Sequence, residues 1–209
     1  MIPVKVLAVR YLANASPSLC RAMGAPVGYP SLGLLTTDCD DATYIALDAA
    51  TKAADVVVAY GRSFYGGAVN ASTPNAGEVM GILAAQTPGA VRSGMEAALA
   101  ALLRVGFSET NKVPYLAHTV SSTGAFLAKE AGVQPGTALA YLIAPPLEGM
   151  YALDAALKAA DVELRKLYRP PSETNFGGGL LSGTQSACEA ACRAFAEAVK
   201  EVAARPKEL

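Results

Sequence analysis

Hydrophobic and polar positions divide the chain into short apolar runs, which predict strands, and longer segments with an apolar stripe at i, i+3, i+4 and i+7, which predict helices. In chain order the pattern predicts strand 4–12, helix 16–23, strand 32–36, helix 46–54, strands 56–60 and 78–84, helix 88–104, strand 115–120, helix 123–131, strand 139–144, helix 152–160, strands 162–168 and 180–182, and helix 185–204. Thr87 and Thr184 precede the helices at 88–104 and 185–204 and are predicted to cap them. The order of elements predicts an α/β (α+β) fold.

A sequence repeat organises these elements into two copies. Residues 46–56 read ALDAATKAADV, and residues 152–162, 106 positions later, read ALDAALKAADV, with ten identities in eleven positions. Each copy has the order strand, helix, strand, helix, strand, strand, helix, which predicts a mixed sheet flanked by helices. We therefore expect two domains, at residues 1–108 and 109–209.

The repeated helix is rich in alanine in both copies. Small side chains let another backbone approach closely, which favours a contact between subunits, whereas alanine is also the best helix former. Both interpretations stay open. Lys52 and Lys158, retained at matching positions, favour the repeated contact.

Composition narrows the choice of partners. Charged residues make up 17% of the chain and hydrophobic residues 52%, while an average domain has about 25% charged residues. The shortage indicates surface buried against other subunits. A net charge of -1 gives no electrostatic footprint for nucleic acid or for anionic lipid. The first apolar run is too short for a signal peptide or a membrane span, so we expect a cytosolic protein.

Two groups of residues have a spacing that metal sites also use. Cys188 and Cys192 lie four apart on a predicted helix, but they belong to its apolar stripe, which favours core packing. Asp38, Asp40 and Asp41 precede the helix at 46–54. Carboxylates can bind a divalent cation, but aspartate here is also a normal helix cap that favours the positive end of the helix dipole.

The second copy lacks these acids and has alanine and two prolines at 144–146. An acid needed only for the fold would be expected in both copies, so this difference favours a further role for the acids of the first copy. The only histidine, His118, lies in an apolar strand, where a packed structural role is the more common one. We expect no catalytic residue, no metal and no cofactor.

The chain resembles the tandem-domain shell proteins of bacterial microcompartments, of the trimeric type from ethanolamine utilisation. The strings that carry the resemblance include SLGLLTTDCDDATYIALDAATKAADVVVAYGRSFYGGA at 31–68, AYLIAPPLEGMYALDAALKAADVEL at 140–164, PPSETNF at 170–176 and SACEAACRAFAEAV at 186–199. The resemblance implies two circularly permuted shell domains, a pseudo-hexameric homotrimer, and flat sheets formed with other shell proteins. It implies a structural protein of a bacterial microcompartment in the cytoplasm, and not an enzyme.

The resemblance also implies two sets of pore residues. Asp40, Thr174 and Phe107 are expected at small pores within each subunit, where a small polar metabolite such as ethanolamine is bound. The loops at the larger central pore are expected to include Arg62, Ser63, Phe64, Tyr65, Glu173, Asn175 and Phe176. Both loops are longer than the two to five residues usual for a hairpin, which favours a functional role. A cobalamin-type cofactor is a further candidate for passage. The alternatives are a small-molecule binding or sensing module that uses an interdomain cleft, and, third, an enzyme.

Overall fold

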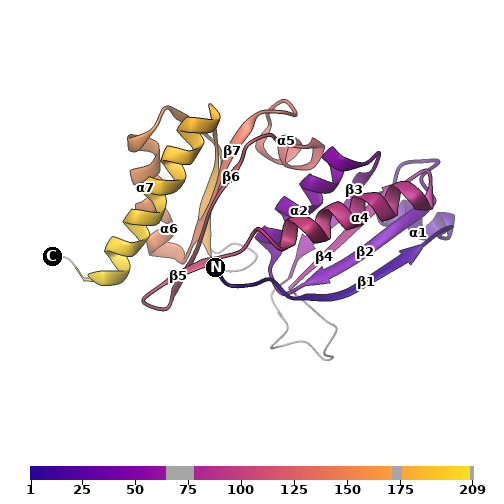
Figure 1. Ribbon diagram of the computed structural model, residues 1–209, viewed down its shortest axis with the longest axis horizontal. Helices are drawn as coiled ribbons and strands as arrows, with labels where there is room; N and C mark the ends of the chain where they lie inside the picture. The colour runs from indigo at the N-terminus through magenta and orange to yellow at the C-terminus, as the bar shows by residue number, and fades with distance from the viewer. Residues whose placement is uncertain (65–77, 171–175, 208–209) are drawn as a thin grey trace. The chain divides into compact units, whose positions relative to one another are not determined.

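A computed structural model describes residues 1–64, 78–170 and 176–207 of the chain. The chain forms two compact units (Figure 1). The N-terminal unit contains Pro3–Gly106 and Gly124–Leu127, and the C-terminal unit contains Met1–Ile2, Phe107–Thr123 and Ala128–Leu209.

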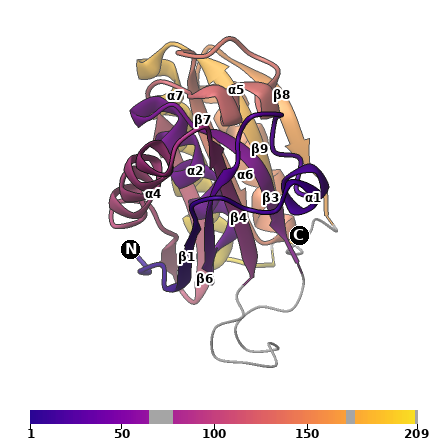
Figure 2. The same ribbon diagram turned by 90° about the vertical axis from the view of Figure 1, so that its right-hand side faces the viewer.

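The N-terminal unit is a four-stranded sheet covered on both faces. Its elements are β1 (Val6–Leu12), α1 (Pro17–Ala22), β2 (Ser31–Thr37), α2 (Asp40–Ala53), β3 (Val57–Ser63), β4 (Val79–Ala85) and α4 (Pro88–Leu102), and the strand order is β1-β2-β4-β3. Because side chains alternate along a strand, Gly33 faces Val91 and Met95 of α4, whereas Leu32 packs with Cys20 of α1. The helices α4 and α1 therefore lie on opposite faces of this sheet (Figure 2).

The C-terminal unit repeats this plan with an added edge strand. Its elements are β5 (Ser108–Thr110), β6 (Val113–Val120), the second half of α5 (Ala125–Ala131), β7 (Ala138–Ala144), α6 (Pro146–Ala159), β8 (Val162–Tyr168), β9 (Gly177–Gly183) and α7 (Gln185–Ala204), and the strand order is β5-β6-β7-β9-β8. The first three residues of α5 belong to the N-terminal unit. The helices α6 and α7 pack on each other and on the sheet. The core between them includes Leu142, Leu181, Cys188 and Phe195.

The α/β (α+β) fold class is confirmed, but the prediction of mixed sheets is wrong. Every strand pair described in the two units is antiparallel. The crossover through α2 does make β2 and β3 run in the same direction, yet β4 lies between them and pairs antiparallel with both. In the C-terminal unit β9 separates β7 from β8 in the same way. The sequence pattern predicts the crossover and the strands β4 and β9 themselves, but not their insertion between the two strands that the crossover joins.

The connector between the copies contains a hairpin that the sequence pattern did not predict. The strand β5 pairs with β6 through Thr110 and Val113. The two residues between them, Asn111 and Lys112, have left-handed backbone with φ of 47° and 65°. Positive φ at both central residues is the geometry of a two-residue hairpin turn, for which asparagine is a common choice. A strand of three residues is too short to show alternation.

Several local predictions are confirmed. The helix α7 has the predicted bounds, Gln185–Ala204. The hydroxyls of Thr87 and Thr184 accept hydrogen bonds from the N–H groups of Ala90 and Ala187, both at 3.2 Å, and so cap α4 and α7. Cys188 and Cys192 are buried in the core, and burial raises the pKa of the Cys192 thiol to about 11.

The alanine-rich helices use part of their small side chains for their own cores. Ala46 and Ala50 of α2, and Ala152 and Ala156 of α6, are fully buried within the units to which they belong. Packing inside each unit therefore accounts for these four alanines.

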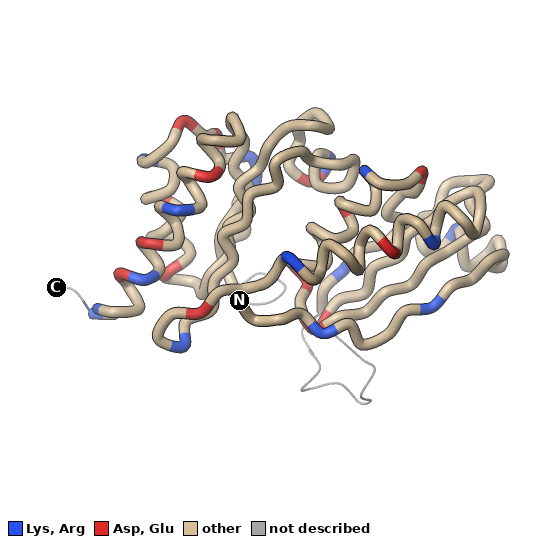
Figure 3. The backbone as a smooth tube through the Cα atoms, in the orientation of Figure 1, with Lys and Arg blue, Asp and Glu red and all other residues tan. Residues whose placement is uncertain are grey.

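Acidic and basic positions are interspersed along both units (Figure 3). Over the described ranges, no helix has the length and apolarity needed to cross a membrane.

Candidate functional site

The start of α2 is built by threonines and not by the aspartates. The N-cap residue is Cys39, and its side chain makes no capping hydrogen bond, so the prediction that an aspartate caps this helix is wrong. Instead, the Thr37 hydroxyl accepts from the Cys39 N–H at 3.1 Å and lies 2.7 Å from the Thr43 hydroxyl, which donates to the Cys39 carbonyl at 2.8 Å. The helix begins earlier than predicted, so Asp40 and Asp41 fall in its first turn, where the helix dipole favours negative charge.

Asp40 lies in a cluster of carboxylates in the N-terminal unit. Asp40 is buried, and one of its oxygens accepts from the Asp41 N–H at 2.9 Å. Glu78, just before β4, donates its N–H to the Thr37 carbonyl at 2.9 Å, which holds it beside the end of β2. Burial raises the pKa of Glu78, and the charges of Asp40 and Asp38 raise it further. The nearby aspartates therefore disfavour the charged form of Glu78.

The neighbours of this cluster show how the fold assembles it. Asp38 accepts a hydrogen bond from the Lys5 N–H at 2.8 Å, so residues near the start of β1 join the end of β2 and the start of β4. Burial, with the charges of the three nearby aspartates, also raises the pKa of the Cys39 thiol. In the part of the chain that the structure describes, no three His, Cys, Asp or Glu residues are grouped so as to hold a metal ion. Nothing in this geometry supports the metal interpretation of the aspartates.

The remaining residues predicted at the small pores are described only in part. Phe107 belongs to the C-terminal unit, where its ring packs against Phe176 with centroids 5.9 Å apart, and its carbonyl accepts from the Ile2 N–H. Thr174 lies outside the described residues. Asp40 belongs to the N-terminal unit. The grouping of Asp40, Thr174 and Phe107 at one pore stays a prediction.

Of the seven residues predicted at the central pore, the structure describes four. Arg62 is exposed near the end of β3, and Ser63 is buried opposite Val79 of β4. Phe64 is exposed and donates its N–H to the Glu78 carbonyl at 2.9 Å. Phe176 comes directly before β9 and contacts Phe107. The other three predicted residues, Tyr65, Glu173 and Asn175, lie outside the described residues.

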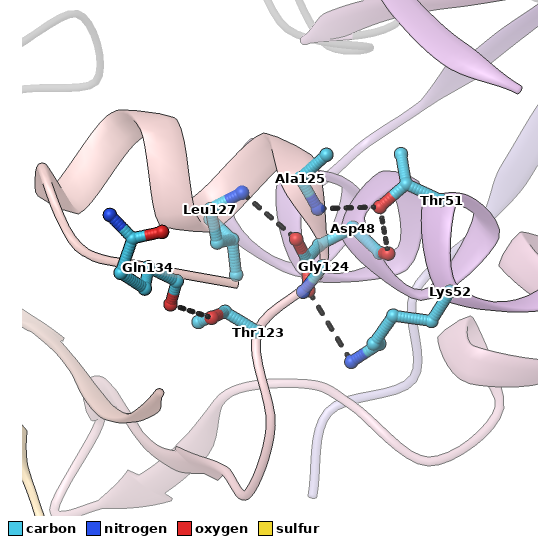
Figure 4. Close-up of polar contacts among 8 residues, drawn as sticks. All are labelled: Asp48, Thr51, Lys52, Thr123, Gly124, Ala125, Leu127 and Gln134. Carbon is cyan, nitrogen blue, oxygen red and sulfur yellow. Dashed lines mark hydrogen bonds and ion pairs between the residues drawn. The ribbon is translucent and has the colours of Figure 1, made fainter. Parts of the chain in front are cut away.

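The sequence analysis missed one buried polar site, at Asp48 of α2. Its side chain is fully buried and accepts from the N–H groups of Gly124 at 2.7 Å and Leu127 at 2.9 Å, with Lys52 at 3.3 Å (Figure 4). The neighbouring Thr51 hydroxyl accepts from the Ala125 N–H at 3.1 Å. These bonds satisfy N–H groups at the start of α5. A signal was present, because Asp48 interrupts a run of small and apolar residues at positions 45–50.

Comparison with known proteins identifies the family. Residues 31–115 match the BMC domain. The chain is 56% identical to the bacterial microcompartment shell protein EutL of Clostridium perfringens over 99% of this chain and 97% of that protein. The chain belongs to the EutL family of bacterial microcompartment shell proteins. The crystal structure of the ethanolamine utilization protein EutL from Leptotrichia buccalis, also 56% identical, covers 100% of this chain and 98% of that chain with a TM-score of 0.96.

A more distant structure shares the fold. The trimeric bacterial microcompartment shell protein PduB is 18% identical, and its structure covers 96% of this chain and 89% of that chain with a TM-score of 0.80. The predicted tandem shell fold and the family resemblance are both confirmed. As a EutL-family shell protein, the chain is a structural component of a bacterial microcompartment in the cytoplasm and not an enzyme.

Proposed function

We propose that the chain forms a homotrimeric tile of the shell, in which two shell domains, residues 1–108 and 109–209, alternate around a ring. The low charged fraction of 17% and the two similar units support this arrangement, because each chain then offers two related sides that pair head to tail until the rotation closes. The trimeric relative with the same fold supports the stoichiometry. Such trimers would then pack into flat sheets with other shell proteins.

We further propose that the tile passes small polar metabolites, with ethanolamine as the first candidate. The observation that carries this proposal is the carboxylate cluster around Asp40, which the second copy replaces with Ala144, Pro145 and Pro146. A carboxylate at a narrow opening lowers the energy of a passing ammonium group. The wider central opening is the proposed route for a larger cofactor of cobalamin type. One of the two loops that border it includes Arg62, and the other includes Phe176.

Such a pore has to bind its solute weakly. A conduit must hold its solute well enough to admit it and release it quickly, which is the compromise that governs channels. A charge contact made at a water-filled opening is worth about 1 kcal/mol. Thr174 is proposed to add a hydroxyl partner, and Phe107 an apolar or cation–π wall.

The test titrates ethanolamine into the trimer and follows binding by NMR. Asp40→Asn is expected to weaken binding severalfold without changing the thermal stability much. Asp41→Asn is the matched control, because Asp41 has the same burial and also lies in the first turn of α2. Equal affinities in wild type and Asp40→Asn would show that the solute passes elsewhere. A wild-type chain that stays at one 21.4 kDa subunit and forms no sheets would instead favour the binding-module alternative.

A further inference from the structure

The two copies of the repeated helix differ in what covers them. Asp48 of α2 and Asp154 of α6 stand at the same position of the repeat, 106 residues apart. The Asp48 side chain is 0% exposed, whereas that of Asp154 is 63% exposed and meets only Lys158 among the contacts described, at 2.6 Å. The difference arises because α2 is covered by Gly124–Leu127, a segment that belongs to the N-terminal unit.

This covering segment fits α2 and β3 through both polar and apolar contacts. Asp48 and Thr51 accept three N–H groups from it, as described above (Figure 4). The Phe126 ring lies over Gly61 of β3, where an added Cβ would come within 3.4 Å of it. Leu127 is only 1% exposed. We call the α2 and β3 surface around Asp48, Thr51 and Gly61 the N-terminal dock.

The counterpart of the covering segment is Ser16–Leu19, 108 positions earlier. The equivalence rests on matching backbone hydrogen bonds, since Ala25 donates to Cys20 at 2.9 Å and Val133 donates to Ala128 at 2.9 Å. Leu19 is the counterpart of Leu127, but it is 39% exposed. All four residues of Ser16–Leu19 are exposed, whereas Gly124 and Leu127 of the counterpart segment are buried.

The counterpart of the N-terminal dock is the surface around Asp154, Leu157 and Leu167, which we call the C-terminal dock. Thr51 and Leu157 are the one difference in the eleven-residue repeat. The N–H that Thr51 accepts comes from Ala125, and the counterpart of Ala125 is Pro17, which has no N–H to donate. The acceptor and the donor are thus lost together, as expected if Pro17 meets Leu157.

A second pair of positions exchanges large for small. In the N-terminal unit the large Phe126 packs on the small Gly61. Their counterparts are the small Ser18 and the large Leu167, which is 40% exposed. In one copy the segment carries the large side chain and the strand the small one, and in the other copy the order is reversed. Two independent position pairs change in a complementary way, which unrelated surfaces would not require.

The contact between the counterparts must be wider than the one observed. A Cβ added at Gly124 would come within 2.6 Å of the Asp48 carbonyl oxygen, so Ser16, the counterpart of Gly124, has to lie farther from its helix. The larger Leu157 and Leu167 side chains fill such a gap. The serine on the segment and the leucines of the dock are therefore complementary in size if the two surfaces meet.

We propose that the C-terminal dock binds the segment Ser16–Leu19 of a second copy of this chain. In this contact the Asp154 carboxylate accepts from backbone N–H groups of the segment, Leu157 packs on Pro17, and Leu167 covers Ser18. The contact is heterologous, so repetition around a ring gives every dock an occupant. The inference rests on the proposed homotrimer and names the residues that close it.

The test breaks the two surfaces separately and then mixes the products. Asp154→Lys disables the dock and leaves the segment intact, while Leu19→Glu disables the segment and leaves the dock intact. Both side chains are exposed, so circular dichroism and melting temperature are expected to stay near wild type. The trimer of each variant alone is expected to dissociate at a protein concentration at least tenfold higher than the wild-type trimer does. Leu167→Glu provides a second dock variant.

Mixing supplies the decisive readout. A chain with Asp154→Lys still has a good segment, and a chain with Leu19→Glu still has a good dock, so the mixture is expected to form a heterodimer that neither variant forms alone. Glu197→Lys is the matched control, because Glu197 is also an exposed helical acid paired with a lysine, at 2.7 Å from Lys200. If the wild type and both variants all form trimers, this inference is overturned and the proposed function still stands. A wild type that never forms trimers overturns the proposed function.

Discussion

The carboxylate of Asp48 accepts a hydrogen bond from the Gly124 N–H at 2.7 Å, although 76 positions separate the two residues in the sequence. A buried charge is costly unless hydrogen bonds and ion pairs satisfy it. Asp48 meets this demand with two N–H donors and with Lys52. The same bonds fix where α5 begins, so a single side chain holds a distant part of the sequence in the N-terminal unit.

Asp48→Ala is expected to lower the free energy of unfolding by about 3 kcal/mol, since it leaves two buried N–H groups without acceptors. Asp154→Ala serves as the control within the repeat and is expected to cost less than about 0.5 kcal/mol in the monomer, because its ion pair is exposed. Urea unfolding at low protein concentration measures both. Similar losses for the two variants would contradict the assignment of Asp48 as an anchor.

Gly124→Ala is expected to destabilise the protein by about 1–3 kcal/mol, because the added Cβ overpacks the site. This Cβ would come within 2.2 Å of the Thr51 hydroxyl oxygen and 2.6 Å of the Asp48 carbonyl oxygen. Gly89→Ala is the control, since it lies in the first turn of α4 and an added Cβ meets nothing within 4 Å. Alanine there is expected to stabilise the helix by about 0.5 kcal/mol. Thermal unfolding of the pair should give shifts of opposite sign.

Glu78→Gln is expected to stabilise the protein at pH 7 and to lose that advantage in acid. The pKa of Glu78 is raised from 4.5 by burial, then by Asp40 and Asp38, so the folded state holds the proton more tightly than the unfolded state does. The contribution of wild-type Glu78 to stability is therefore complete below pH 4.5 and is lost as the pH rises through the raised value. The comparison of melting temperatures for the two proteins at pH 4 and pH 7 checks this. A constant difference at both pH values would exclude the effect.

Ala156→Glu is expected to prevent folding, because Ala156 is fully buried in the core of the C-terminal unit. An unpaired charge placed there has no partner to offset its loss of hydration. Ala159→Glu, on the exposed part of the same helix, is the control and should leave the circular dichroism spectrum unchanged. Soluble, folded Ala156→Glu protein would remove the assignment of this helix face to the core.

The sequence by itself determined the elements whose causes are local. The apolar stripe placed α7 at its observed bounds, and Thr87 and Thr184 marked the starts of two helices because a cap bonds to a residue three positions away. The repeat predicted two copies of one unit, and long matching strings carried the family resemblance that the comparisons confirmed. The acidic cluster was visible as a difference between the copies, although the role of its aspartates as caps was not correct.

Only the tertiary structure decided what depends on distant neighbours. The insertion of β4 between β2 and β3 fixed the strand directions, and no pattern within either strand encodes it. Asp48 and Asp154 make the same point, because nearly identical local sequences leave one carboxylate fully buried and the other exposed. Local sequence sets the helix and the face on which a side chain lies. Burial is set by the segment that packs on that face, and for Asp48 that segment is 76 residues away.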